Sequence, residues 1–110
     1  MKKVMNDPAA FVDESLQGII AAHGGQLKFA GDDTRAVVRK EAPVEGKVAI
    51  VTGGGYGHLP TFLGFVGQGF CDGVAVGNVF TSPSSDAILN AARAVDGGKG
   101  ILFLFGNYMG

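Results

Sequence analysis

The stretch from Val48 to Pro60, VAIVTGGGYGHLP, constrains the fold more than any other part of the chain. Its apolar run, residues 48–51, is rich in β-branched side chains and predicts a strand buried on both faces. Four glycines within residues 52–57 allow a turn with positive φ angles and a close approach to a ligand. Pro60 suits the first turn of a helix, and residues 62–66 supply apolar side chains at helical spacing. This order predicts an open α/β sheet with the turn at the carboxyl end of a strand, where ligands bind.

Two nucleotide-binding motifs fit this turn poorly. A P-loop requires GxxxxGK[ST], and no Lys-Ser or Lys-Thr pair follows these glycines. Gly53 and Gly55 match the first two glycines of GxGxxG, but His58 occupies the third position and no partner acid is obvious about twenty residues further on. From residue types alone, His58 fits two roles: a side chain that acts on a ligand, or a polar residue that caps a helix or bonds a backbone carbonyl.

The first 46 residues predict one helix followed by short strands. Residues 7–22 have Asp7 as a candidate N-cap, Pro8 at the first helical position and one apolar face. Residues 26–46 predict one or two short strands that end in a turn at 43–46. The charged residues of this region are expected to be solvated: Asp32, Asp33, Arg35, Arg39 and Lys40. Adjacent residues on a strand point to opposite faces, so Asp32 and Asp33 do not predict a metal site.

The second half of the chain predicts two further strands around a helix. Residues 70–76 predict a short strand, and Ser82 before Pro83 is the expected N-cap of the next helix, with Ser84 or Ser85 as alternatives. Residues 100–105 predict a second fully buried strand. Buried strands separated by helices indicate a largely parallel or mixed sheet flanked by helices, which places the 53–58 and 106–110 loops on one rim.

Composition limits the classes of partner and compartment. The chain has 110 residues, of which 46% are hydrophobic, so it is about one domain's worth and can bury a modest core. Its net charge of −1 argues against nucleic acid or a membrane surface as partner. Cys71 is the single cysteine, which excludes an internal disulfide and favours a reducing, cytoplasmic setting. No stretch has the length of a signal peptide's apolar region or a bilayer span.

Four motifs, in order, carry a family resemblance: GGGYGHLP, GFVGQGF, FTSPSSD and VDGGKGILFLFGNYMG. Together they resemble the amino-terminal part of the substrate-binding module of the dihydroxyacetone kinases, over nearly the whole chain. The resemblance implies a two-domain, homodimeric module that binds a short-chain ketose and presents its terminal hydroxyl for phosphorylation. This chain, residues 1–110, would be the incomplete first domain. A separate nucleotide-binding kinase module or subunit would supply phosphate, from ATP-Mg or a phosphotransferase-system donor, and this chain would bind no cofactor or metal.

The same resemblance implies which residues meet the ketose. Gly55, Tyr56, Gly57 and His58 match the loop that contacts substrate. His58 is the candidate general base, because a neutral imidazole can accept a proton from a sugar hydroxyl. In the family, a lysine and an aspartate of the second rim loop also bind the substrate, and the lysine position falls on Gly106. A second histidine, far later in the family's chains, holds the ketone covalently.

Three departures from the family pattern suggest a variant branch. Gly106 replaces the usual lysine, Tyr56 the usual serine and Leu59 the usual glutamate. The space gained at Gly106 suggests a four-carbon ketose such as erythrulose. The family's aspartate would follow Gly110, so we expect a fragment of a longer protein that is inactive alone. A non-catalytic ketose sensor or coregulator on the same fold is the alternative.

Overall fold

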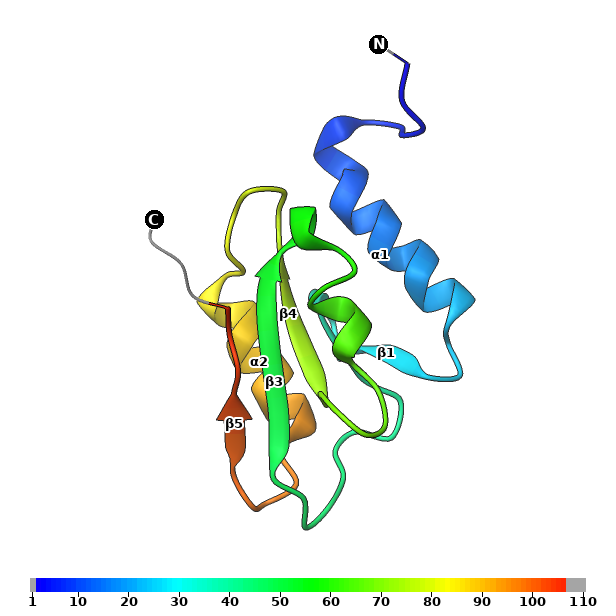
Figure 1. The fold of residues 1–110 in the computed structure, drawn as a ribbon. Helices are drawn as coiled ribbons and strands as arrows, with labels where there is room; N and C mark the ends of the chain where they lie inside the picture. Colours follow the sequence, from blue (N-terminus) through cyan, green and yellow to red (C-terminus); the bar gives the residue numbers. More distant parts are fainter. Residues whose placement is uncertain (1, 107–110) are drawn as a thin grey trace.

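A computed structural model describes residues 2–106. Its centre is a five-stranded mixed sheet in the order β1-β2-β4-β3-β5 (Figure 1). The strands are β1 (Leu27–Ala30), β2 (Asp33–Arg39), β3 (Ala49–Gly55), β4 (Gly73–Gly77) and β5 (Ile101–Phe103). The helices are α1 (Phe11–Ala22) and α2 (Ser85–Val95), with 3₁₀ turns η1 (Pro8–Ala10), η2 (Tyr56–His58) and η3 (Leu63–Phe65). β3 pairs in parallel with β4 and β5, whereas β2 runs antiparallel to β1 and β4, so the predicted mixed α/β sheet is confirmed.

Helices lie on both faces of the sheet because the strands in its middle bury both sets of side chains. On β2, Val37 belongs to the core that contains Leu16 of α1, whereas its neighbour Val38 belongs to the core that contains Val95 of α2. Both valines have no exposed surface. Alternate burial of this kind follows from the two-residue period of a strand. The segment after β3 joins α1 on its face, through Tyr56 and residues near it.

The first helical segment begins as the sequence predicts. The Asp7 carboxylate accepts a hydrogen bond from the Ala9 N–H at 2.9 Å, and Pro8 begins the 3₁₀ turn η1 that leads into α1. The helix ends at Ala22, where the exposed His23 donates its backbone N–H to the Ile19 carbonyl at 2.9 Å. No described helix has the length and apolar character needed to cross a membrane.

The glycine-rich stretch differs from its predicted form. β3 begins at Ala49, after the half-exposed Val48, and continues through Gly55, so three of the glycines belong to the strand. None of the glycines in residues 53–57 has a positive φ angle. Gly53, Gly54 and Gly55 instead allow other segments to pack closely against the strand.

The predicted helix after Pro60 is also wrong. Residues 56–66 contain the two separate 3₁₀ turns η2 and η3, with i to i+3 hydrogen bonds such as Val66 N–H to the Leu63 carbonyl at 3.1 Å. Gly64 and Gly67 weaken any longer helix here, because glycine loses more backbone freedom in a helix than other residues do. The segment instead places the Phe62 ring against Gly54 of β3.

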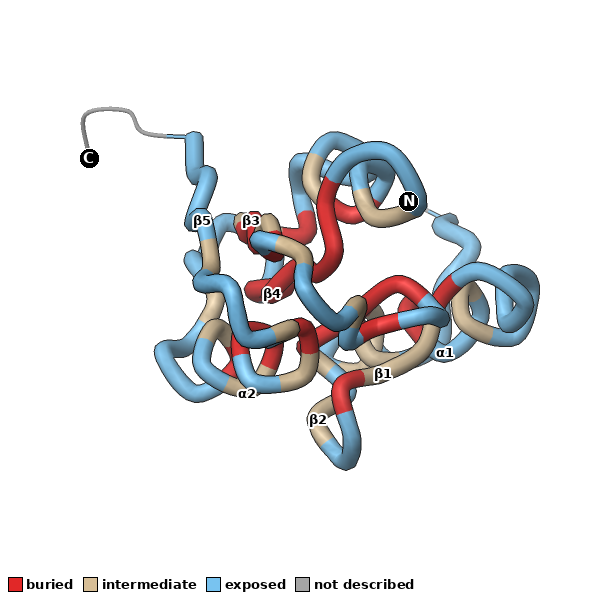
Figure 2. Tube along the Cα trace, turned by 90° about the horizontal axis from the view of Figure 1, so that it is seen from below, coloured by how far each residue is buried: buried red, intermediate tan, exposed pale blue. Residues whose placement is uncertain are grey.

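The last strand is an edge strand and is not fully buried, contrary to prediction. β5 pairs with β3, and Ile101 packs against the core beneath α2. Leu102 and Phe103 are 52% and 46% exposed (Figure 2). In the described part of the chain no strand pairs with the other edge of β5, so its apolar run stays on the surface.

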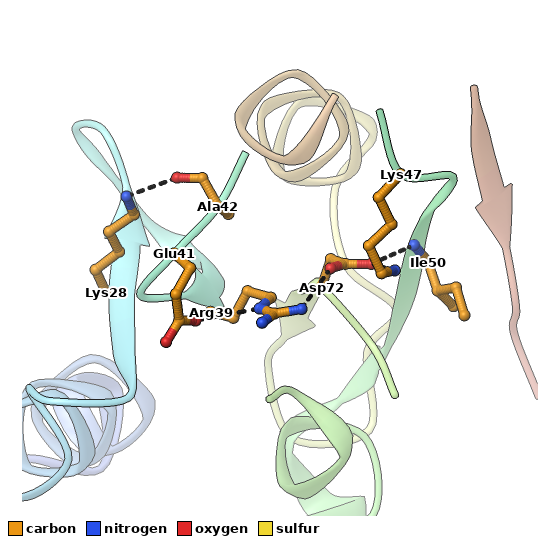
Figure 3. A network of polar contacts seen from close by, with 7 residues as sticks. All are labelled: Lys28, Arg39, Glu41, Ala42, Lys47, Ile50 and Asp72. Carbon is orange, nitrogen blue, oxygen red and sulfur yellow. Dashed lines mark hydrogen bonds and ion pairs between the residues drawn. The ribbon is translucent and has the colours of Figure 1, made fainter. Parts of the chain in front are cut away.

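Arg39, predicted to be solvated, is buried in an ionic network around Asp72 (Figure 3). Asp72 Oδ1 lies 3.3 Å from Arg39 Nη1, and Asp72 Oδ2 lies 2.6 Å from Lys47 Nζ. The Ile50 N–H donates to Asp72 Oδ2 at 2.8 Å. Glu41 pairs with Arg39 from the surface; a hydrogen bond from its own backbone and the one from Arg39 hold the pKa of Glu41 below its usual value. The network ties the start of β3 to the start of β4, at the end of the sheet away from His58.

Candidate functional site

A cavity of about 250 Å³ lies at the carboxyl end of β3. Its walls come from the end of β3, from η2 and the residues after it, from the loop between β4 and α2, and from the chain after β5. The lining residues are Gly53, Gly54, Gly55, His58, Phe62, Phe80, Thr81, Ser82, Pro83, Ile88, Phe105 and Gly106. Because β3, β4 and β5 are parallel, their carboxyl ends meet at this edge of the sheet, which is where open α/β folds bind ligands.

The structure brings three of the predicted site residues together. Gly55, His58 and Gly106 all line this cavity, so the prediction that the glycine loop and the chain after β5 share one rim is confirmed for Gly106. Residues 107–110 of the second rim loop lie outside the described residues.

The glycines of β3 allow neighbouring segments to approach the strand closely. A Cβ atom at Gly53 would lie 2.9 Å from Phe105 Cε1, and one at Gly55 would lie 3.1 Å from the Thr81 carbonyl oxygen. Gly77, at the end of β4, is more crowded still, because a Cβ atom there would overlap the same carbonyl oxygen. The loop that carries Thr81 can therefore fold back onto β3 and β4 only where side chains are absent.

His58 is exposed at the end of η2 and faces the cavity. Its imidazole meets the Phe62 ring edge to face, with centroids 5.6 Å apart and planes at 86°. Among residues 2–106 no side-chain hydrogen bond engages the imidazole. A neutral imidazole in this position can accept a proton from a ligand hydroxyl placed within hydrogen-bond reach.

Tyr56 and Gly57, also predicted to contact substrate, do not line the cavity. The Tyr56 ring is buried and packs at 89° against Phe11 at a centroid distance of 5.7 Å, within the core beneath α1. Its backbone N–H donates to the Asn78 carbonyl at 3.2 Å. A Cβ atom at Gly57 would lie 3.7 Å from Val79 Cγ1. The Tyr56 side chain therefore anchors the loop in the core beneath α1, away from the cavity. Contacts between a substrate and Tyr56 or Gly57 stay predictions.

The sequence predicts Ser82 as the N-cap of the second helix, with Ser84 or Ser85 as alternatives, and the structure selects Ser84. The Ser84 hydroxyl oxygen accepts a hydrogen bond from the Ala87 N–H at 3.1 Å and starts α2. Ser82 and Thr81 line the cavity instead, and both residue types carry a hydroxyl that can donate and accept hydrogen bonds. The sequence contained a usable signal, because several hydroxyl residues before one helix exceed what a single cap requires.

Aromatic residues form the other wall of the cavity, a position that the sequence does not predict. Phe62, Phe80 and Phe105 all line the cavity. Phe80 is 99% exposed and has a φ of 59°, an uncommon value for a residue with a side chain. Phe62 was assigned to the apolar face of a helix that does not form.

His58 is the only residue with an ionisable side chain among the described residues that line the cavity. Among the residues that line the cavity in the described chain there is no lysine, arginine, aspartate or glutamate. Residues 2–106 also contain no group of three or more His, Cys, Asp or Glu side chains that could hold a metal ion. A small neutral ligand with hydroxyl groups fits this lining better than an anion such as a phosphate, which requires positive charge or an array of free N–H groups.

Comparison with known proteins gives a family match and close relatives. The model of the Dak1 domain matches residues 17–110. The chain is 47% identical, over its whole length, to the dihydroxyacetone-binding subunit DhaK of PTS-dependent dihydroxyacetone kinase 2 from Listeria innocua, and covers 33% of that protein. It is 46% identical, again over its whole length, to L-erythrulose kinase from Pectobacterium atrosepticum, of which it covers 18%. The chain thus spans a third or less of these relatives.

Solved structures share the fold. The dihydroxyacetone kinase from C. freundii, in complex with AMP-PNP and Mg²⁺, superposes with a TM-score of 0.86 at 35% identity, over 97% of this chain and 20% of that one. The dihydroxyacetone kinase operon co-activator Dha-DhaQ superposes with a TM-score of 0.74 at 35% identity, over 83% of this chain and 27% of that one.

Proposed function

The chain belongs to the Dak1 domain family, and from that membership we propose that it forms the first part of a two-domain module that binds a short-chain ketose. In this proposal the module presents the terminal hydroxyl of dihydroxyacetone or erythrulose for phosphorylation. The relatives named as dihydroxyacetone-binding subunit and as erythrulose kinase support this substrate class.

The observation that carries the proposal is the placement of His58 in a small, neutral cavity at the carboxyl edge of a parallel sheet. The cavity, at about 250 Å³, is smaller than the sites that hold drug-sized ligands, and so suits a three- or four-carbon sugar. Thr81 and Ser82 offer hydroxyl partners for the sugar. His58 takes the proton of the reacting hydroxyl as general base, which raises the nucleophilicity of its oxygen toward phosphorus.

The phosphate donor belongs to another module in this proposal. Phosphoryl transfer requires positive charge or a metal around the moving group, and the described lining of this cavity supplies no lysine, arginine or carboxylate. Two donors have support among the similar proteins: a phosphotransferase-system protein, from the PTS-dependent relative, and a magnesium nucleotide, from the neighbour solved with AMP-PNP and Mg²⁺. We further propose a homodimer in the cytoplasm; the lone, buried Cys71 is in keeping with a reducing compartment.

Gly106 supports a four-carbon ketose within this class. Among residues 2–106, a Cβ atom built there would meet nothing closer than Phe62, at 3.8 Å, so the described part of the cavity is open beside this residue. A substrate with one more carbon than dihydroxyacetone can extend into that space.

The second candidate is a ketose sensor that binds the sugar without turning it over. The likeness to the operon co-activator Dha-DhaQ favours it, because that protein shares this fold at the same identity as the kinase. Both candidates use the same cavity. They differ in whether a phosphate donor acts on the bound sugar.

Binding and turnover measured on the complete protein separate these candidates. We expect dihydroxyacetone and erythrulose to bind in calorimetry, with glycerol, which lacks the ketone, as the control ligand. Phosphorylation of the bound ketose in the presence of a donor module supports the kinase. Binding without phosphorylation by either class of donor supports the sensor, and absence of ketose binding refutes the proposed function.

A further inference from the structure

We propose that Phe62 is a positioning residue that fixes the plane of the His58 imidazole at the cavity. The inference rests on the proposed function in one respect, since it assumes that His58 acts on the ligand. The geometric part of the inference, that Phe62 orients the imidazole, stands apart from that assumption.

The contact between the two rings is the described interaction that orients the imidazole. The centroids lie 5.6 Å apart with the planes at 86°, the edge-to-face geometry that aromatic rings favour. Within residues 2–106, no side-chain hydrogen bond holds either ring nitrogen of His58. An exposed imidazole without such a partner would otherwise sample several rotamers.

Phe62 can orient His58 because β3 and the core hold Phe62 itself. Its ring lies over Gly54, where a Cβ atom would overlap ring atoms Cδ2 and Cε2 and would lie 2.8 Å from Cζ. The ring is partly buried and packs against the core beneath α1. It also borders both the cavity and a small void behind it that Tyr56 and Leu63 line. The absence of a side chain at Gly54 therefore leaves the space that the Phe62 ring occupies, which we call the seat of the ring.

This arrangement has a catalytic consequence. A general base must lie within hydrogen-bond reach of the hydroxyl it deprotonates, and small misplacements of a reacting group lower rates strongly. Loss of the ring should therefore reduce kcat, because the imidazole loses its fixed plane. It should change KM little, because the hydroxyl and backbone groups around the sugar remain.

The first test compares Phe62→Leu with Phe65→Leu in the complete protein. Phe65 lies in the same segment but packs against Phe70, at 5.5 Å, and does not line the cavity. We expect kcat to fall on the order of tenfold to a hundredfold for Phe62→Leu, with KM nearly unchanged, and neither to change for Phe65→Leu. Phe62→Met, which keeps similar volume without a ring, carries the same expectation if the leucine variant folds poorly. Equal effects at both positions, or a change confined to KM, overturn the proposal.

A double-mutant cycle tests the seat at Gly54. Gly54→Ala should displace the ring and lower kcat as Phe62→Leu does. With alanine at position 62 the added methyl group at position 54 has no side chain to displace, so the double variant should lose no more than Phe62→Ala alone. Losses that multiply would show that Gly54 and Phe62 act independently, which contradicts the proposal.

Histidine NMR separates a failure of this inference from a failure of the proposed function. In the ligand-free protein with ring-labelled histidine, Phe62→Leu should increase the ring motion of His58 measured by ¹³C relaxation, with its resonances assigned by His58→Asn, and leave that of His23 unchanged. Unchanged ring motion of His58 overturns the positioning role whatever the activity. Greater ring motion together with full activity of His58→Asn leaves the positioning role intact and refutes the catalytic role of His58.

Discussion

The Nζ atom of Lys47 lies 2.6 Å from Oδ2 of Asp72, a carboxylate that also pairs with the buried Arg39. Asp72 is 2% exposed, so these two cations and the Ile50 N–H replace the water that its charge would otherwise require. The pairing links the segment before β3 to the start of β4. The two parallel strands are thereby fixed at one end of the sheet, while their other ends carry the cavity.

We expect Asp72→Ala to destabilise the fold by about 3–5 kcal/mol, because it leaves the buried Arg39 without its buried partner. Urea unfolding of the wild type and variant measures the difference. Glu41→Gln is the control, since Glu41 pairs with the same arginine from the solvent, and its effect should be small. A similar loss in both variants would mean that the burial of Asp72 does not set the strength of the network.

Gly77→Ala tests whether missing side chains let the cavity loop pack. A methyl group at this position would overlap the Thr81 carbonyl, so we expect a loss of about 1–3 kcal/mol in the free energy of unfolding and weaker ketose binding. Gly67→Ala is the matched control, because a Cβ there meets no atom of the described residues within 4 Å and its φ is not positive. If the two variants are equally stable, the close approach of the loop to Gly77 is not a constraint on the fold.

The sequence predicted the helix start and the strand that depend mainly on neighbouring residues. Asp7 and Pro8 start the first helical segment as expected, and the apolar run predicted at 48–51 supplies the first three residues of β3, without Val48. Parallel strands have their carboxyl ends at the same edge of the sheet. This rule predicted that one rim would contain Gly55, His58 and Gly106.

Features that depend on distant partners escaped prediction. The sequence predicted a solvated Arg39, because its buried partner Asp72 lies 33 positions away along the chain. The apolar residues after Pro60 have helical spacing, yet the Phe62 ring packs on Gly54 and the segment forms 3₁₀ turns. Ser82 and Ser84 are equivalent candidates for a cap until backbone geometry selects Ser84.

Cys71 gives a prediction about alkaline pH. Burial, followed by the nearby charge of Asp72, raises the pKa of the Cys71 thiol above its ordinary value of 9.0. The folded state therefore keeps the proton more tightly than the unfolded state does, so this stability is fully present below about pH 9 and is lost as the pH rises through the folded pKa. The free energy of unfolding should fall less steeply above pH 9 in Cys71→Ala than in the wild type. Parallel pH profiles of the two proteins would contradict this.

Gly106→Lys tests the substrate preference. The wild type should use erythrulose at least as well as dihydroxyacetone, because the cavity is open beside Gly106. A lysine there would fill this space, so the ratio of kcat/KM for erythrulose to that for dihydroxyacetone should fall. Gly106→Ala, with its methyl group 3.8 Å from Phe62, should change the ratio much less. A wild type that strongly prefers dihydroxyacetone would remove the basis for this inference.

The most direct measurement of the central claim is the turnover of His58→Asn in the complete protein with its phosphate-donating partner, beside His23→Asn as the matched control. His23 is the exposed residue at the end of α1 and does not line the cavity, so its variant should keep wild-type activity. His58→Asn should fold normally and lose on the order of a hundredfold or more in kcat, because asparagine cannot accept the proton of the sugar hydroxyl. Near-normal turnover of His58→Asn would contradict the account.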